Sequence, residues 1–412
     1  MRINRDVYLQ KLIDRKHNGM VKVVTGVRRC GKSYLLFELF REHLQHEGVP
    51  EDHIIAVQLD DRKNKALRDP DACDAYVRSR IGGDGQYYIL LDEVQLMDEF
   101  EDVLNGFSHI RNADVYATGS NSRFLSTDVI TEFRGRGDEV RIHPLSFAEY
   151  HAAVDADWDD AWDSYLIYGG MPYAVQLATD TDRAAYLQRL FRETYLRDIV
   201  ERNGVRHEAE LEELTNVVAS AVGSLTNPEK LARSFSSMKG LSLSAPTIKR
   251  YLGYLEDAFL VGKAKRYDVK GKRYISTPLK YYFEDVGLRN ALLNFRQHEE
   301  THLMENVIFN ELCMRGYAVD VGVVDITEAG AHKRVEIDFV ANRGSDRVYL
   351  QSAFALPDEA KREQETRPLR AVPDSFQKVV IQGGSHVPTR DENGLLTMGV
   401  KQFLLEGASL GA

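Results

Sequence analysis

A glycine-rich loop between Gly26 and Ser33 contains the residue types that bind nucleotide phosphates. Its sequence, GVRRCGKS, fits the pattern G-x-x-x-x-G-K-[ST] at every position. Glycines let such a loop curl until its backbone N–H groups point at phosphate oxygens, and the following helix adds its positive end. Lys32 would reach the β- and γ-phosphates, and the Ser33 hydroxyl would hold Mg²⁺. The loop therefore predicts binding of ATP with Mg²⁺. The residues expected to contact the nucleotide here are Gly26, Val27, Arg28, Arg29, Cys30, Gly31, Lys32, Ser33 and Tyr34.

Two acids, Asp92 and Glu93, follow the apolar run YYILL. Such a short apolar run is typical of a strand buried on both faces of a parallel sheet. Asp92 would hold Mg²⁺ through water, and Glu93 would polarise the attacking water as the general base. The pair favours hydrolysis over simple binding. The alternative interpretation is a surface acidic pair after a core strand.

Polar residues after the next predicted strand, Ser120 and Asn121, would lie near the γ-phosphate and sense the nucleotide state. Alternatively, they satisfy the backbone of their own turn. Arg134 and Arg136 stand among glycines in FRGRG, and either could act as an arginine finger, in the same chain or from a neighbouring subunit. A solvated turn is the alternative.

Strands and helices alternate around these residues. The predicted strands span residues 21–25, 53–59, 87–91, 114–118 and 139–142, and a helix over residues 33–47 follows the loop. This alternation predicts an α/β fold with a parallel sheet between two layers of helices. A short amphipathic helix is expected within residues 1–20.

Five motifs in this order, GVRRCGKS, YYILLDEVQ, ATGSNS, FRGRGDEVRIHPLSFAEY and YGGMP, resemble a broad prokaryotic family of AAA-type P-loop ATPases. In that family a C-terminal domain similar to restriction endonucleases follows the ATPase. The resemblance implies the strand order 5-1-4-3-2, Glu93 as catalytic base, and a small helical lid. It predicts an ATPase core over residues 1–143, a lid over 144–206, a middle domain over 207–285 and an endonuclease-like domain over 286–412.

The middle segment, residues 207–285, has the pattern of a winged helix-turn-helix. Helices are expected at 211–222, 228–235 and 247–258, and strands at 260–267 and 280–284 would form the wing. The segment between these strands is strongly basic, with Tyr267 and Tyr274 interleaved, as phosphate-backbone contacts require. A solvated hairpin or a surface for an acidic protein are the alternatives. The candidate nucleic-acid contacts are Lys263, Lys265, Arg266, Lys270, Lys272 and Arg273.

Near the C-terminus, Glu305, Asp338 and Gln351 resemble the metal-binding set of endonuclease-like domains. The lysine expected two residues after the last member is replaced by Ala353. Lys333 or Arg334 could substitute for it. Without such a cation the site is predicted to be degenerate, and the domain to serve structure or recognition rather than cleavage.

Bulk properties restrict the class of protein. The 412 residues suffice for two or three domains, and the net charge of −10 argues against a generally basic, nucleic-acid-coating surface. Three scattered cysteines predict a reducing, cytoplasmic location, and no membrane span is expected. We therefore predict an ATP-hydrolysing AAA-type switch or motor with a nucleic-acid or protein client, either monomeric or a homo-oligomer. The alternatives are an ATP-bound binding module with little turnover and a divalent-metal nuclease.

Overall fold

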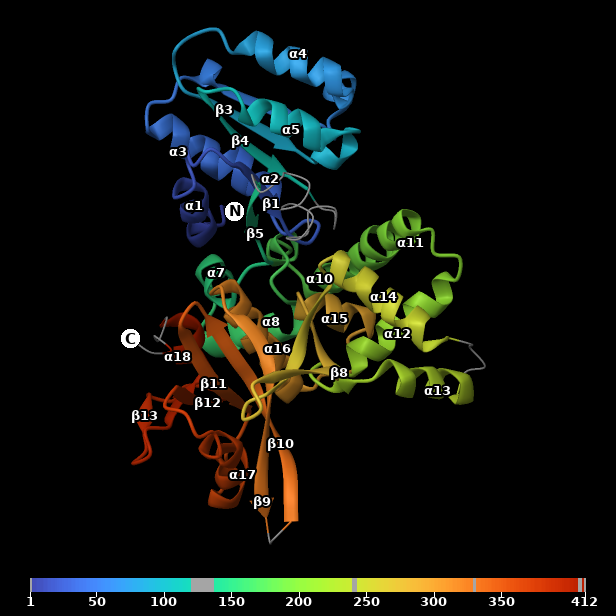
Figure 1. Cartoon of the computed structure of the whole chain (residues 1–412), viewed down its shortest axis with the longest axis vertical. Coiled ribbons are helices and arrows are strands. Elements are labelled where there is room, and N and C mark those ends of the chain that lie inside the picture. The colour runs from blue at the N-terminus through green and yellow to red at the C-terminus, as the bar shows by residue number, and fades with distance from the viewer. Residues whose placement is uncertain (1, 120–136, 239–242, 329–330, 407–409, 411–412) are drawn as a thin grey trace. The chain divides into compact units, whose positions relative to one another are not determined.

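The computed structural model describes residues 2–119, 137–238, 243–328, 331–406 and 410. It divides into two compact units (Figure 1). Unit 1 is Met1–Pro144 with Asp257–Phe259, and unit 2 is Leu145–Glu256 with Leu260–Ala412. Each unit contains its own β-sheet, and the two are described separately below.

Unit 1 is built on a five-stranded parallel sheet of order β2-β3-β4-β1-β5. Its strands are β1 Val21–Thr25, β2 Ile54–Gln58, β3 Tyr87–Asp92, β4 Ala113–Thr118 and β5 Gly137–Arg141. The order 5-1-4-3-2 implied by the family resemblance is thus confirmed. The fifth strand begins and ends earlier than the predicted range 139–142. Every residue of β1 and β3 is buried, as central strands covered on both faces require.

Helices cover both faces of this sheet (Figure 1). They are α1 Asp6–Ile13, α2 Lys32–Tyr34, the π-helical segment Leu35–Phe40, α3 Arg41–His46, α4 Pro70–Arg80 and α5 Phe100–Ser108. Short 3₁₀ turns occur at Glu51–His53, Arg62–Arg68 and Val94–Leu96. The predicted helix after the loop is continuous from Lys32 to His46, with a π-helical middle. On one face, α4 and α5 bury Val77, Phe100 and Phe107 against Val57 and Ile89 of the sheet.

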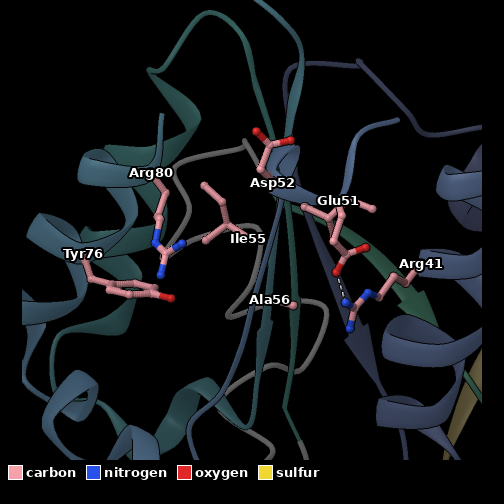
Figure 2. A pocket seen from close by; sticks show the side chains of 8 residues that line it. Arg41, Glu51, Asp52, Ile55, Ala56, Tyr76 and Arg80 are labelled. Atoms are coloured by element: carbon pink, nitrogen blue, oxygen red, sulfur yellow. Dashed lines mark hydrogen bonds and ion pairs between the residues drawn. The ribbon is translucent and has the colours of Figure 1, made fainter. Parts of the chain in front are cut away.

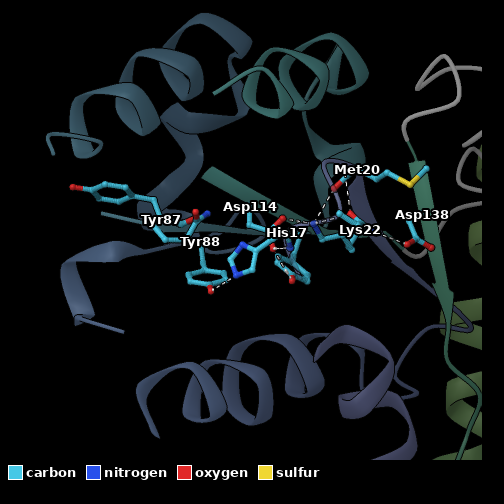
Figure 3. A network of polar contacts seen from close by, with 10 residues as sticks. His17, Met20, Lys22, Tyr87, Tyr88, Asp114 and Asp138 are labelled. Atoms are coloured by element: carbon cyan, nitrogen blue, oxygen red, sulfur yellow. Dashed lines mark hydrogen bonds and ion pairs between the residues drawn. The ribbon is translucent and has the colours of Figure 1, made fainter. Parts of the chain in front are cut away.

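A buried polar network lies near the amino ends of the strands of this sheet (Figure 3). Lys22 on β1 is fully buried and forms an ion pair with Asp114 on β4. Tyr116 Oη donates to the same carboxylate at 3.0 Å, and the backbone N–H of His17 donates to it at 3.1 Å. Burial lowers the pKa of Lys22, and Asp114 acts in the opposite direction. This pairing satisfies a charge that would otherwise be costly in the core, and it anchors the segment that enters β1.

Unit 2 combines helices with a nine-stranded mixed sheet of order β13-β14-β12-β11-β10-β9-β7-β8-β6. Its strands are β6 Leu225–Thr226, β7 Val261–Asp268, β8 Arg273–Phe283, β9 Ala318–Glu328, β10 Ala331–Arg343, β11 Asp346–Ala353, β12 Gln377–Gln382, β13 Thr389–Arg390 and β14 Leu396–Gly399. The helices before β7 are α7 Phe147–Ala153, α8 Trp158–Tyr168, α9 Pro172–Val175, α10 Asp180–Arg189, the π-helical segment Leu190–Leu196, α11 Arg197–Asn203, α12 Glu208–Ser220, α13 Pro228–Met238 and α14 Ala245–Asp257. Those after β8 are α15 Val286–Leu292, α16 Glu300–Met314, α17 Glu359–Arg370 and α18 Val400–Leu405.

The three helices and two strands expected between residues 207 and 285 are present, as α12, α13, α14, β7 and β8. The strands β7 and β8 pair with each other, and β7 also pairs in parallel with β9 of the C-terminal segment. The boundary predicted between residues 285 and 286 therefore runs through one continuous sheet. The assignments of a winged helix and of an endonuclease-like domain stay predictions.

Candidate nucleotide-binding site

Three neighbouring strands of unit 1 bring the predicted phosphate-binding residues to one edge. Strands β1, β4 and β3 are adjacent and parallel, so their carboxyl ends meet there. Thr25 ends β1, Thr118 ends β4 and Asp92 ends β3. The glycine-rich loop follows β1 directly. This edge is where open parallel sheets of α/β proteins bind their ligands.

The loop adopts a backbone that needs its two glycines. Gly26 has φ 141°, and a Cβ atom there would lie 2.2 Å from the carbonyl oxygen of Ile142. Gly31 has φ 102° and caps the helix that begins at Lys32. Lys32 is buried, and its Nζ donates to the carbonyl oxygens of Gly26 at 3.0 Å and Val27 at 3.1 Å. The lysine therefore lies inside the curl of the loop, where a phosphate cradle requires it.

Ser33, Asp92 and Thr118 form a hydroxyl–carboxylate cluster beside the loop. Ser33 Oγ donates to Asp92 Oδ1 at 3.1 Å, and Thr118 Oγ1 donates to the same oxygen. Burial raises the pKa of Asp92, while the two hydroxyl donors act to lower it. Hydroxyl and carboxylate oxygens are the hard ligands that Mg²⁺ prefers, and substrate phosphates with water complete its usual shell. The residues present therefore fit Mg²⁺ with a bound nucleotide. In the described part of the chain, no group of three or more His, Cys, Asp and Glu side chains has a metal-binding arrangement.

Glu93 lies next to this cluster in a strained conformation. It has φ 50°, a left-handed backbone that non-glycine residues rarely adopt, and its N–H donates to Thr118 Oγ1 at 3.1 Å. Gln95 Nε2 donates to the carboxylate of Glu93. The strained turn directs the backbone of Glu93 toward the same hydroxyl that binds Asp92. Strain of this kind is found at functional sites more often than elsewhere.

Three residues that sequence reasoning did not select support the site. Thr118 joins Asp92 to Glu93, as described above. Arg5 is buried and donates from Nη1 to the carbonyl of Cys30 at 3.0 Å, and from Nη2 to that of His143 at 2.6 Å. Glu139 Oε1 accepts from Thr25 Oγ1 at 2.5 Å. Thr118 could have been found, since it ends a predicted strand at the same sheet edge. Nothing in the local sequence marks Arg5 or Glu139.

Four predicted residues lie outside the part of the chain that the structure describes. They are Ser120, Asn121, Arg134 and Arg136. Arg28, Arg29 and Tyr34 lie on the loop and the first turn of its helix, and Arg29 is exposed with φ 62°. The roles assigned to all these residues stay predictions.

A separate concavity of about 550 Å³ lies along the outer edge of β2 (Figure 2). Arg41, Glu51 and Asp52 line it on one side, and Tyr76 and Arg80 on the other. Its walls contain none of the predicted nucleotide-binding residues. It is therefore distinct from the site at the carboxyl ends of the strands.

In unit 2 the structure brings together the three residues of the predicted degenerate nuclease set. Glu305 comes from α16, Asp338 from β10 and Gln351 from β11. The N–H of Asp338 is 3.4 Å from Gln351 Oε1, and Gln351 Nε2 donates to Glu365 at 3.0 Å. Burial and then the charge of Glu305 raise the pKa of Asp338 to about 7. Glu365, on α17, was not selected from the sequence.

The cation at this cluster is Lys280, a residue of β8. Its Nζ lies 3.1 Å from Glu305 Oε1 and 3.8 Å from Asp338 Oδ1. Burial disfavours the charged amine, but Glu305 and Asp338 more than offset this and raise the pKa of Lys280. Arg334, one of the two cations suggested from the sequence, forms an ion pair with Asp325 at 3.2 Å instead. Glu305 and Asp338 thus have their cation, Lys280, within the chain.

Several of the predicted nucleic-acid contacts are engaged by other parts of unit 2. Lys263 forms an ion pair with Glu256, and the partly buried Arg266 lies 3.4 Å from Glu336. Arg273 lies 3.5 Å from Asp268. The exposed members of the set are Lys263, Lys265, Lys270, Lys272 and Arg273. Exposure alone does not establish a nucleic-acid contact, which stays a prediction.

The described helices were also compared with the length and apolarity that a membrane span requires. None of them meets both requirements.

Comparison with protein families identifies two regions of the chain. Residues 18–151 match the family model of an AAA domain. Residues 159–299 match a domain of unknown function, DUF8612. Residues 18–151 include the loop, both acids and all five strands of the unit 1 sheet. This part of the chain is therefore an AAA domain.

Two curated proteins are similar over most of the chain. A protein of Haemophilus influenzae, described only as an uncharacterized protein, is 33% identical over 98% of this chain and 99% of its own length. An uncharacterized protein of Methanocaldococcus jannaschii is 26% identical over 89% of this chain and 80% of its own.

Solved structures resemble the chain more weakly. The Walker-type ATPase of Pyrococcus abyssi has a TM-score of 0.49 and 15% identity, covering 71% of this chain and 96% of its own. The Aeropyrum pernix ORC1 protein, solved in complex with DNA, has a TM-score of 0.29 and 14% identity, covering 71% and 92%. At these scores the likenesses support no conclusion about function.

Proposed function

We propose, from the premise that this chain belongs to the same family as the Haemophilus influenzae protein and contains an AAA domain, that it binds and hydrolyses ATP. One observation carries the proposal. Ser33 Oγ, Thr118 Oγ1 and the Asp92 carboxylate meet beside the phosphate-binding loop, and Glu93 follows immediately at the same sheet edge. Simple nucleotide binding does not require a second acid at this position, whereas hydrolysis uses a residue that orients or deprotonates the attacking water.

Each residue has a distinct role in this proposal. Bound Mg²⁺·ATP supplies the phosphoryl group and the metal charge. Lys32 would exchange its loop carbonyl partners for phosphate oxygens, and Ser33 with Asp92 would hold the metal. Glu93 would accept a proton from the attacking water as its carboxylate is released from Gln95. Thr118 would hold Asp92 and Glu93 in position relative to each other, because its hydroxyl hydrogen-bonds to both residues.

The test is steady-state phosphate release with Mg²⁺ by the wild type, Glu93→Gln and Lys32→Ala. Loss of a general base lowers turnover by about a hundredfold or more, while ATP binding persists. Lys32→Ala should instead lose ATP affinity, because the phosphates lose their cation. Normal turnover by Glu93→Gln would disprove the assignment of the base.

A second candidate function is an ATP-bound switch with little turnover, and the contact between Gln95 and Glu93 favours it. A carboxylate held by a hydrogen-bond donor must give up that bond before it can accept a proton from water. Gln95→Ala distinguishes the two functions. An increase in turnover in this variant would identify a restrained ATPase that awaits an activator. Absence of turnover in both proteins, with ATP bound, would identify the switch.

A further inference from the structure

Five side chains of unit 2, three of them exposed and two half-buried, form a chain of rings and cations here called the ring surface. They are Lys265 and Tyr267 of β7, Tyr274 of β8, Arg347 of β11, and Phe376, which precedes β12. The rings of Tyr267 and Tyr274 meet edge to face with centroids 5.4 Å apart. Lys265 Nζ lies 5.6 Å from the Tyr274 ring. Arg347 lies 5.5 Å from the Tyr267 ring and 5.4 Å from that of Phe376.

The two end rings of this surface are open to solvent. Tyr274 is 61% exposed and Phe376 is 41% exposed. Among the described residues of unit 2, the other exposed large aromatic side chain is Tyr173 on α9. Large rings lose favourable burial when they remain in water, so two of them on one cation-linked surface suggest a ligand with flat faces.

The ring surface is held in place by its neighbours. Tyr274 Oη donates to Asp320 at 3.0 Å, and Arg347 Nε donates to Asn342 Oδ1 at 2.7 Å. The first bond restricts the rotation of the Tyr274 ring, and the second fixes the Arg347 guanidinium that lies over Tyr267 and Phe376. Less side-chain entropy is therefore lost when a ligand binds.

The charge around these rings is predominantly positive. Asp320 is 8% exposed and is occupied by Tyr274, and Asp268 accepts from the N–H of Gly271 at 2.8 Å. The exposed cations of the adjoining β7–β8 turn are Lys270, Lys272 and Arg273. Lys270 Nζ donates to a backbone carbonyl, that of Asp325, and so retains its charge. Asp374, close to Phe376 in the chain, accepts from the N–H of Phe376 at 3.2 Å and from Tyr349 Oη at 2.7 Å. The acids nearest the rings are thus engaged by hydrogen bonds, whereas the cations of the turn are exposed.

We propose that the ring surface binds single-stranded nucleic acid. Bases would stack on Tyr274 and Phe376, and phosphates would lie beside Lys265, Arg347 and the basic turn. A duplex fits less well, because its bases are stacked on one another and offer no free face to a side chain. The surface lies entirely within unit 2. The proposal therefore goes beyond ATP hydrolysis and does not depend on it.

The test is fluorescence anisotropy of a labelled oligothymidylate and of a labelled duplex, with the full chain at low salt and without nucleotide. We expect the single strand to bind more tightly than the duplex. Tyr274→Ala and Phe376→Ala should each weaken binding by about five- to a hundredfold, the range measured for loss of one stacked base. Tyr274→Phe should bind like the wild type, since it retains the ring and loses only the hydroxyl.

Tyr173→Ala is the matched control, because it removes an equally exposed ring, 53% accessible, from another part of unit 2. It should leave the affinity unchanged. Glu93→Gln should also bind the oligonucleotide normally, which separates failure of this proposal from failure of the ATPase proposal. No binding of oligothymidylate, preference for the duplex, or wild-type affinity in both alanine variants would overturn the proposal. An acidic protein partner would then be the better explanation of the surface.

Discussion

Two of the buried lysines, Lys32 in unit 1 and Lys280 in unit 2, have opposite surroundings. Lys32 in the glycine-rich loop is 4% exposed and donates only to the carbonyl oxygens of Gly26 and Val27. Lys280 in unit 2 is 6% exposed and lies between the carboxylates of Glu305 and Asp338. Among the described residues, Lys32 has hydrogen bonds to carbonyl oxygens and no ion pair. Lys280 is neutralised by the protein itself.

The carboxylates near these two lysines differ in the same way, in whether a cation of the chain pairs with them. Asp92 accepts from two neutral hydroxyls, those of Ser33 and Thr118, and has no lysine or arginine in hydrogen-bond contact among the described residues. A charge that the chain does not cancel remains available to a charged ligand, whereas an internal ion pair must first be broken. The comparison explains why we assign ligand chemistry to the loop and a structural role to the cluster around Lys280.

The largest effect that tests this contrast is on stability. Lys280→Met would leave two buried carboxylates without their cation, and we expect it to lower the free energy of unfolding of unit 2 by about 3–5 kcal/mol. Lys32→Met, which removes no ion pair, should change stability far less. The measurement is urea unfolding, followed by tryptophan fluorescence for Lys280→Met and by far-UV circular dichroism, which reports on both units, for Lys32→Met. The chain's two tryptophans, Trp158 and Trp162, both lie in unit 2 and so report on that unit.

A rescue variant tests the cause of this loss. The triple variant Lys280→Met, Glu305→Gln, Asp338→Asn removes the cation and both anions, and it should recover much of the lost stability. Equal stability of Lys280→Met and the wild type would show that the ion pairs are not what stabilises this sheet. Lys280 would then have to be reconsidered as a cation available to a ligand.

A further effect is expected from pH. Burial and Glu305 raise the pKa of Asp338 from 3.8 to about 7. Between these values the folded chain holds a proton that the unfolded chain has released, so unit 2 should lose stability as the pH rises from about 4 to about 7. The slope for one group cannot exceed about 1.4 kcal/mol per pH unit. The urea midpoint of tryptophan fluorescence, measured across this range, should fall less steeply in Asp338→Asn than in the wild type. Some slope should remain in the variant, because burial also raises the pKa of Asp285 in unit 2 to about 6.

The succession of strands, loop and helix in unit 1 could be predicted from the sequence, because short runs of consecutive residues indicate each of these elements. An apolar strand, a glycine-rich loop and a helix occur within residues 21–46, and the Asp92–Glu93 pair ends a strand of six buried residues. The strand order itself came from the family resemblance. The contacts of Arg5 and Glu139 with the loop region join residues far apart in the chain, and no local pattern encodes them.

The structure of unit 2 was harder to predict from the sequence, because its decisive contacts also join residues far apart in the chain. Its basic segment indicated a wing that binds phosphate, yet Lys280 at the end of that segment is buried against Glu305, 25 residues later. The parallel pairing of β7 with β9 joins strands separated by three other elements. Periodicity predicts that a strand is present, but not which strand lies beside it. The cation of the carboxylate cluster therefore could not be chosen from spacing.

The smallest effect we predict concerns the hydroxyl of Thr118. Thr118→Val has nearly the same shape but can neither donate to Asp92 nor accept from the N–H of Glu93. We expect kcat for phosphate release to fall about tenfold, equivalent to about 1.4 kcal/mol of transition-state stabilisation, with KM for ATP little changed. Thr118→Ser retains the hydroxyl and should retain the activity. If Thr118→Val hydrolyses ATP as fast as the wild type, the relative position of Asp92 and Glu93 does not depend on the Thr118 hydroxyl. If KM rises instead, the hydroxyl contributes to binding the nucleotide rather than to the chemical step, and the neutral environment of Asp92 serves to hold Mg²⁺ alone.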